Sequence, residues 1–180
     1  MKIFISGYPG VGKTTVLMRV IDLLKRDGLV VGGIVCPEVR EEGRRVGFGI
    51  VDLIKGDRGW LARLCGSQCE GPRVGRYCVN ERDATSIGVN AIEKALLLAD
   101  VVAIDEIGPM ELAVPALKSA ILKVVKGDKT LMAVIHWRLR NELIGLTSGR
   151  HEVVEITLTN RNHIYRDIYS KIRASTESPP

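Results

Sequence analysis

A glycine-rich loop near the N-terminus is the feature that most constrains the fold of this chain. Residues 2–6 form a short apolar run with β-branched side chains, and residues 15–26 follow with the periodicity of an amphipathic helix. Between them stands the pattern Gly7-x-x-x-x-Gly12-Lys13-Thr14. This order of strand, glycine loop and helix is the context in which the pattern predicts a phosphate-binding loop. The alternative is a glycine turn that binds no ligand.

Each residue type in this loop has a physical role at such a site. The glycines lack a Cβ, so the backbone can adopt positive φ and turn its N–H groups toward a polyphosphate at the positive end of the following helix. We expect Lys13 to reach the β- and γ-phosphates, and the Thr14 hydroxyl to ligate a bridging Mg²⁺. The predicted nucleotide-binding residues of this segment are Gly7, Tyr8, Pro9, Gly10, Val11, Gly12, Lys13, Thr14 and Thr15.

Two adjacent carboxylates form the second candidate site. The run of residues 101–104 is wholly apolar and leads directly into Asp105 and Glu106. Open α/β sheets bind ligands beyond the carboxyl ends of their strands. We therefore expect Asp105 to orient the Mg²⁺ ligands and Glu106 to act as general base on an attacking water. The alternative is a pair of solvated acids at a strand end.

The remaining periodicity predicts an α/β fold: a P-loop NTPase with a mostly parallel five-stranded core sheet flanked by helices. A glutamate directly after the magnesium aspartate favours RecA-like order, in which residues 131–136 lie between the strands that carry the two motifs. The core strands are expected at Lys2–Ser6, Val30–Val35, Val101–Asp105, Leu131–His136 and Val153–Thr157, and the helices at about 15–26, 86–98, 114–125, 138–144 and 161–172.

An insertion interrupts this alternation at about residues 40–80. Residues 44–52 and 76–80 are strand-like and are expected to form an antiparallel extension, with an irregular segment at 55–75 between them. Residues 1–174 are then expected to form one domain, and residues 175–180 a flexible tail.

Composition limits the setting and the partners. The 180 residues are 46% hydrophobic, yet no run of about 18 apolar residues indicates a membrane span, and no signal-peptide pattern is present, so a cytoplasmic location is expected. The net charge of +5 is dispersed over the chain, and only 4% of residues are aromatic. Any binding of nucleic acid is therefore expected to be weak.

The four cysteines are Cys36, Cys65, Cys69 and Cys78. The spacing of Cys65 and Cys69 has one residue too many for the usual zinc knuckle, and no histidine lies near them, so a metal site is not expected. Free thiols are the default expectation in the cytosol. A structural bridge among Cys65, Cys69 and Cys78 is the alternative.

Several other side chains have two interpretations each. One arginine of the insertion can serve as an internal arginine finger that stabilises charge on the γ-phosphate. Alternatively, these arginines are solvated or form salt bridges with acids such as Glu41 and Glu42. Glu111 is either a helix-capping or a surface acid, and His136 with Trp137 either senses the γ-phosphate or packs. The arginines concerned are Arg40, Arg44, Arg45, Arg73 and Arg76.

Five strings resemble the small nucleoside-triphosphatase family known from thermophiles, whose relatives include the cancer-related nucleoside-triphosphatase. They stand in family order over nearly the whole chain and read GYPGVGKTT, PEVREEGRRVGFGIVDL, RVGRY, DEIGPMEL and TNRNHIYRDI. The resemblance implies a compact monomer that hydrolyses nucleoside triphosphates to diphosphate and phosphate slowly and with little base preference. Lys13 and Glu106 are the expected catalytic residues.

The expected lack of base preference also rests on a missing motif. Guanine-specific phosphate-loop enzymes use Asn-Lys-x-Asp, whereas the nearest string, Asn80-Glu81-Arg82-Asp83, lacks the lysine and precedes the Asp105 strand. If the fifth strand lies beside the first, Asn160 and Arg161 border the base, where Arg161 can stack on any ring while Asn160 alternatively caps the last helix. ATP, GTP, CTP and UTP are then expected to be similar substrates.

Two other functions use the same loop. One is a kinase that phosphorylates a nucleoside, nucleotide or polynucleotide held by the insertion. The other is a nucleic-acid-associated module whose binding is gated by nucleotide.

Overall fold

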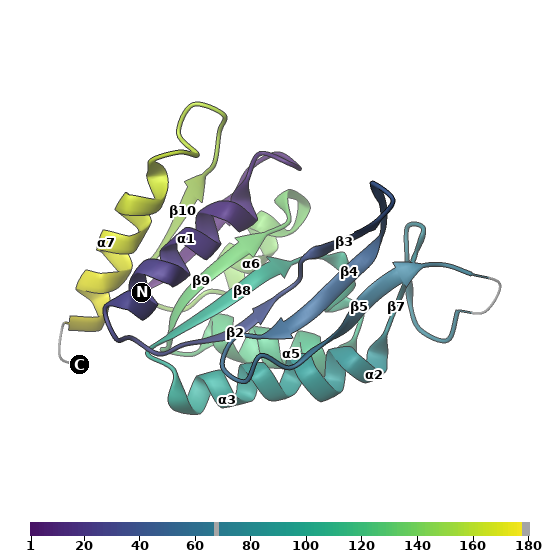
Figure 1. The fold of residues 1–180 in the computed structure, drawn as a ribbon. Coiled ribbons are helices and arrows are strands. Elements are labelled where there is room, and N and C mark those ends of the chain that lie inside the picture. The colour runs from purple at the N-terminus through teal and green to yellow at the C-terminus, as the bar shows by residue number, and fades with distance from the viewer. Residues whose placement is uncertain (67–68, 178–180) are drawn as a thin grey trace.

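One mixed sheet runs through the whole molecule in the computed structural model, which describes residues 1–66 and 69–177. Nine of its ten strands follow the order β10-β1-β9-β8-β2-β4-β5-β7-β6, and β3 pairs with β4 outside this path. The first five positions of this order are parallel strands, and the remainder is antiparallel. Figure 1 shows the parallel part flanked by long helices and the antiparallel part extending from it.

The parallel core matches the predicted RecA-like order. Its strands are β1 (Lys2–Ser6), β2 (Val31–Val35), β8 (Val101–Ile107), β9 (Thr130–Ile135) and β10 (His151–Glu155). The strand β9 lies between β1 and β8, as the adjacent carboxylates predicted, and β10 lies on the other side of β1. All five predicted core strands are therefore present, with ends shifted by at most two residues.

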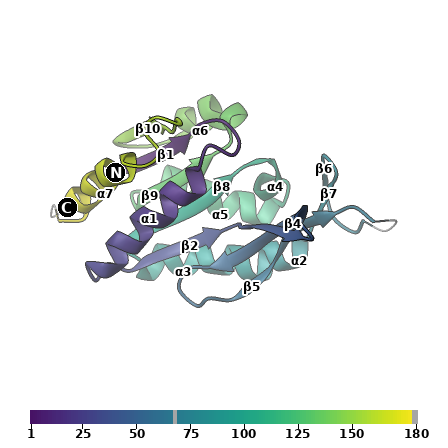
Figure 2. The same cartoon turned by 45° about the horizontal axis from the view of Figure 1, so that its top comes forward.

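Helices cover the two faces of this core. Figures 1 and 2 show α1 (Lys13–Arg26) and α7 (Ile164–Glu177) side by side on one face, with α3 (Asn90–Leu98) and α5 (Pro115–Lys126) on the other. Successive side chains of β1 point to opposite faces of the sheet and pack in the two hydrophobic layers beneath the helices. Ile3 and Ile5 pack with α1, whereas Phe4 packs in the layer of α3 and α5. The remaining helical segments are α2 (Glu81–Asp83), η1 (Ala84–Val89), α4 (Pro109–Leu112), η2 (Trp137–Leu139) and α6 (Arg140–Leu146).

The antiparallel extension corresponds to the predicted insertion but contains more strand than expected. Its members are β3 (Glu38–Glu41), β4 (Arg44–Asp52), β5 (Arg58–Leu64), β6 (Arg73–Val74) and β7 (Tyr77–Val79). The expectation that residues 55–75 are irregular is wrong, because β5 pairs with both β4 and β7 and buries Leu61 and Ala62. Long-range pairing holds this segment as a strand despite the glycines and charges that surround it.

Two helix boundaries also differ from expectation. The helix expected at residue 86 begins at Glu81 and passes through the π-helical turns of η1 before α3. The helix α7 continues through Glu177, where a flexible tail was expected from Ser175, and residues 178–180 of that expected tail lie outside the described residues. In the described ranges, no helix combines the length and apolarity needed to cross a membrane.

Candidate active site

The glycine loop connects the buried strand β1 to the first turn of α1. Its three glycines have φ values of 144° at Gly7, 76° at Gly10 and 108° at Gly12, as the sequence pattern predicted. A Cβ at Gly7 would come within 2.6 Å of the Ile156 carbonyl oxygen at the end of β10. Both the backbone conformation and this close approach therefore require glycine at position 7.

Lys13 turns back over the loop that precedes it. Its Nζ donates hydrogen bonds to the carbonyl oxygens of Gly7 at 3.0 Å and Tyr8 at 3.2 Å. Thr14 and Thr15 follow on exposed positions of the first helical turn, while Val11 anchors the loop in the core. The loop thus places one ammonium group and the free N–H groups of a helix N-terminus around the same space.

Asp105 is delivered to this space by β8. Its side chain is 3% exposed, and burial raises its pKa to about 6, although a hydrogen bond with the Thr14 hydroxyl and the charge of Lys13 act in the opposite direction. The hydroxyl and the carboxylate predicted to share a metal ion therefore lie together, although they come from positions 91 residues apart in the chain.

Glu106 lies beside the same lysine. Burial raises its pKa, whereas the charges of Lys13 and His136 lower it. His136 directly follows β9, and its backbone N–H donates to the Ile107 carbonyl at 3.1 Å. The ends of three neighbouring strands, β1, β9 and β8, thus bring Lys13, His136 and Glu106 to one edge of the sheet.

Glu111 is, like Asp105, a buried carboxyl group at this edge. It is 5% exposed and accepts a hydrogen bond from the Gly108 N–H at 3.0 Å, so the capping interpretation is confirmed and the surface interpretation is wrong. Burial raises its pKa to about 8, and the charges of Glu106 and Asp105 also raise it. The pKa of the Cys36 thiol is raised for the same reasons, burial first and Glu111 second.

A cavity of about 440 Å³ lies beside the glycine loop. Arg140, at the start of α6, supplies a cation to it, and Trp137 is 55% exposed there and stacks against His136 with ring centroids 5.9 Å apart. Arg140 was missed because its sequence neighbourhood has no motif. Its only signal is that it follows the strand that the topology places between the two motifs. The cavity is lined by Ser6, Gly7, Tyr8, Trp137, Arg140 and Glu155.

Asn160 and Arg161 lie in the turn after β10. The Asn160 side chain accepts from the Thr157 N–H and donates to the Glu155 carbonyl, both at 2.9 Å, so it holds this turn together. The Cδ of Arg161 lies 3.8 Å from the position that a Cβ at Gly12 would occupy. Since β10 lies beside β1, the condition for this turn to border the glycine loop is met.

Three of the five candidate arginines of the insertion make side-chain contacts within the extension. Arg40 and Arg45 both form ion pairs with Glu38, which replaces the expected partners Glu41 and Glu42. Arg76 lies 5.4 Å from the centroid of the Tyr77 ring. These contacts favour a structural role for Arg40, Arg45 and Arg76.

The string from Asn80 to Asp83 also has a structural use. The Asn80 side chain accepts from the Asp83 N–H at 3.1 Å, and the Asp83 carboxylate accepts from the Trp60 N–H at 2.8 Å. The string thereby ties α2 to β5 in the extension.

Comparisons with known proteins agree with this geometry. A family model described as NTPase matches residues 2–169. The chain is 47% identical to the nucleoside-triphosphatase THEP1 of Ignicoccus hospitalis, over 91% of each protein, and 44% identical to that of Methanopyrus kandleri, over 90% of this chain and 89% of the other.

Two solved structures are similar over almost their whole length. The crystal structure of THEP1 from the hyperthermophile Aquifex aeolicus has a TM-score of 0.78 and 27% identity, covering 96% of this chain and 99% of that one. The solution structure of a human cancer-related nucleoside triphosphatase has a TM-score of 0.71 and 30% identity, covering 97% and 98%.

Proposed function

The chain belongs to the NTPase family whose model matches residues 2–169, and we propose that it is a Mg²⁺-dependent nucleoside-triphosphatase that converts ATP, GTP, CTP and UTP to diphosphate and phosphate. The observation that carries this proposal is the meeting of two motifs at one edge of the sheet. Lys13 and Thr14 come from the loop after β1, while Asp105 and Glu106 come from the end of β8.

The residues at this edge suit a hard divalent cation. The Thr14 hydroxyl and the Asp105 carboxylate are oxygen donors of the kind that Mg²⁺ prefers, and they lie within reach of one another. The carboxyl groups of Asp105 and Glu106 also concentrate negative charge that Lys13 alone does not balance. Bound Mg²⁺ would supply charge neutralisation on the β- and γ-phosphates.

The loop and Lys13 act on the phosphates in this proposal. The N–H groups at the start of α1 and the Lys13 ammonium hold the β- and γ-phosphoryl oxygens and stabilise the charge that develops when the bond to the bridging oxygen breaks. That charge leaves with the nucleoside diphosphate.

Glu106 acts on the attacking water. Its carboxylate accepts a proton as the water oxygen bonds to the γ-phosphorus, and burial makes it a stronger base than a solvated glutamate. The charge of Lys13 acts against this increase in the pKa of Glu106 and favours the ionised carboxylate.

Low base specificity follows from the residues beside the glycine loop. The side-chain amide of Asn160 is hydrogen-bonded to two backbone groups, so in this proposal it does not form specific hydrogen bonds with a base. Arg161, next to Gly12, can stack on any base. A buried hydrogen-bonding partner can discriminate between bases by about 10⁴-fold in kcat/KM, whereas stacking discriminates far less.

A turnover assay with each of the four nucleoside triphosphates tests this function. With Mg²⁺ present, the kcat/KM values should lie within about tenfold to a hundredfold of one another, and a chelator should remove activity. A preference above about a thousandfold for one base would contradict the proposal.

The same assay separates hydrolysis from phosphoryl transfer. Labelled γ-phosphate should appear as inorganic phosphate whether or not nucleosides, nucleotides or RNA are added. Transfer of the label to one of these acceptors would make the protein a kinase. Because the positive charge is dispersed, RNA should bind weakly and with a steep salt dependence.

A further inference from the structure

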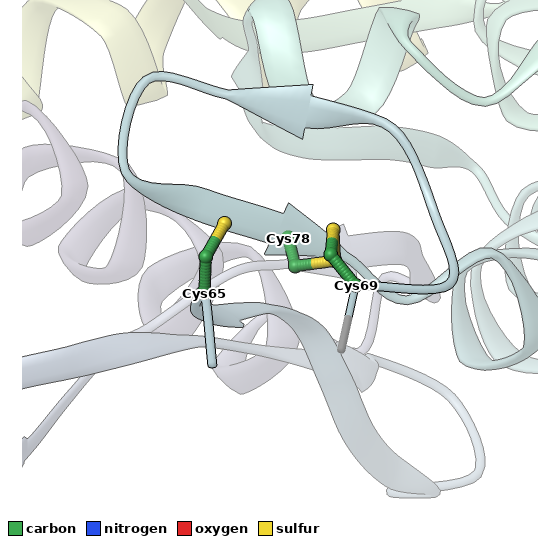
Figure 3. Close-up of side chains that lie close together, drawn as sticks. All are labelled: Cys65, Cys69 and Cys78. Carbon is green, nitrogen blue, oxygen red and sulfur yellow. A yellow bond between two sulfur atoms is a disulfide. The ribbon is translucent and has the colours of Figure 1, made fainter. Parts of the chain in front are cut away.

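Three of the four cysteines meet at the outer end of the extension, far along the sheet from the glycine loop. Cys65 follows β5, Cys78 lies in β7, and Cys69 lies in the connection between them. Their sulfur atoms all lie within 4.8 Å of one another (Figure 3). Cys69 and Cys78 form a disulfide, whereas Cys65 and Cys36 keep free thiols.

This arrangement corrects the expectation drawn from cysteine spacing. Free thiols were the default, which is wrong for Cys69 and Cys78, and the alternative of a bridge within this group is confirmed. The spacing of Cys65 and Cys69 alone also gave no reason to expect a metal site. Pairing of β5 with β7 adds a third sulfur that the spacing does not reveal.

Strand pairing holds two of these cysteines independently of the disulfide. The Cys65 N–H donates to the Arg76 carbonyl at 2.9 Å, and Cys78 is paired in register with Arg63 on one side and Arg73 on the other. Reduction of the disulfide therefore leaves Cys65 and Cys78 close together, and only Cys69 gains freedom to move.

Opening of the disulfide brings the three sulfurs within reach of the spacing of a thiolate metal site. Thiolates bound at about 2.3 Å to one tetrahedral Zn²⁺ lie about 3.8 Å apart. The Cys65 sulfur lies within 4.8 Å of the other two, and the Cys69 and Cys78 sulfurs, which are bonded to each other in the disulfide, can separate to this spacing by side-chain rotation after reduction. The Gly71 carbonyl oxygen lies 3.2 Å from the Cys69 sulfur and 3.8 Å from the Cys78 sulfur. The fourth ligand can therefore be an oxygen atom, either from the Gly71 carbonyl or from water, beside the three sulfurs.

The surrounding charge suits three thiolates. A Zn²⁺ ion with three thiolates carries a net charge of about −1. Arg63 and Arg73 are the register partners of Cys78, and directly paired residues project to the same face of a sheet. Their positive charges therefore lie on the side of the sheet that carries the Cys78 sulfur.

We propose that the reduced chain binds one Zn²⁺ through Cys65, Cys69 and Cys78. A dithiol reductant transfers two electrons and two protons to the Cys69–Cys78 disulfide and leaves as its own disulfide. Zn²⁺ then displaces the three thiol protons, which pass to solvent. The cysteines at the outer end of the extension are thus cross-linked by a metal ion under reducing conditions and by a disulfide under oxidising conditions.

Titration of the full-length protein with Co²⁺ and then Zn²⁺ tests the proposal. Protein reduced with a phosphine and handled without oxygen should take up one Co²⁺ with a thiolate charge-transfer band, which one equivalent of Zn²⁺ removes. The oxidised protein should show no such band. This band reports thiolate ligands only, so Co²⁺ bound by carboxylates at the candidate active site does not interfere.

Variants identify the ligands. Cys65→Ser and Cys78→Ser should each weaken Zn²⁺ binding by at least about 100-fold, whereas Cys36→Ser should retain wild-type affinity. A band that persists unchanged in Cys65→Ser would overturn the proposal, because it would come from the Cys69 and Cys78 thiols alone. Absence of the band in the reduced wild-type protein would overturn it as well.

Protection from alkylation tests the same site without any substitution. In the reduced wild-type protein, Zn²⁺ should slow modification of Cys65, Cys69 and Cys78 together, as read by peptide mass. Unchanged reaction of Cys65 in the presence of Zn²⁺ would exclude it as a ligand and overturn the proposal even if the serine variants fail to fold.

Discussion

The parallel core and the antiparallel extension belong to one sheet but are stabilised differently. In the core, β1 is buried along its whole length, and β9 is buried at every position after Thr130. In the extension, β5 buries only Leu61 and Ala62 and β3 has no buried residue. The core is covered by helices on both faces, whereas the extension has helical cover along η1 and α2 and ends in a disulfide.

This difference shows where each part of the sheet obtains its stability. Helices on both faces let the core bury continuous apolar strands, and the carboxyl ends of those strands can then hold polar groups in fixed positions. The extension buries less apolar surface, so a covalent bridge contributes where packing does not. We therefore expect substitutions at the core edge to change catalysis, and substitutions in the extension to change stability.

The largest effect should come from Lys13→Ala at the core edge. This substitution removes the cation that lies over the glycine loop, and tight binding of nucleoside triphosphates should be lost. Calorimetry with Mg²⁺-ATP measures the loss, with Lys118→Ala on the exposed face of α5 as the matched control. Normal binding and turnover by Lys13→Ala would remove the basis for locating function at this edge.

Glu106→Gln should separate binding from chemistry. The amide cannot accept the proton of the attacking water, so kcat should fall by about 100-fold or more while Mg²⁺-ATP still binds. Single-turnover kinetics and calorimetry measure the two quantities, and Glu93→Gln on the exposed side of α3 serves as control. An equal loss of binding would assign Glu106 a structural or metal-binding role instead.

Cys69→Ser should show the opposite behaviour in the extension. Cys69 and Cys78 are nine positions apart, and loss of so short a covalent loop should lower the free energy of unfolding of the oxidised protein by about 2–3 kcal/mol. Its kcat should stay within about twofold of wild type, since the bridge lies outside the candidate active site. Urea unfolding provides the measurement, and Cys65→Ser, which leaves the bridge intact, is the control. A large fall in kcat would show that the two regions are energetically coupled.

The effect of Glu111→Gln should be visible as a change in the pH dependence of stability. Burial raises the pKa of Glu111 from 4.5 to about 8, so the folded state binds more protons than the unfolded state between these values. The stability that the neutral carboxyl group provides is complete below the lower pKa and is lost as pH rises through the upper one. Gln keeps an acceptor for the Gly108 N–H but does not ionise.

Urea unfolding of the metal-free protein tests this linkage. Within that pH window, the wild type should lose about 1.4 kcal/mol more stability per pH unit than Glu111→Gln. Parallel curves for the two proteins would mean that the Glu111 carboxyl group stays ionised in the folded state.

Local sequence patterns were sufficient to predict the strands of the core and the conformation of its glycine loop. The positive φ values of the glycines and the positions of the five core strands follow from short-range spacing and apolar runs. The strand β5 was not predictable in this way, because its glycine and charged residues are held by pairing with β4 and β7. Arg140 was missed for a related reason, since its position in the cavity depends on how β9 and α6 fold beside the loop.

The sequence by itself determined the glycine loop and the adjacent carboxylates at a strand end, because each depends on residue types at fixed local spacing. The glutamate directly after Asp105 also indicated the strand order. Only the tertiary structure revealed the contacts between distant groups that no motif predicts. Strand pairing brings Cys78 to Cys65 and Cys69, and burial beside Asp105 and Glu106 raises the pKa of Glu111. Such contacts depend on register and on exclusion of water, and neither is encoded in the spacing of residues along the chain.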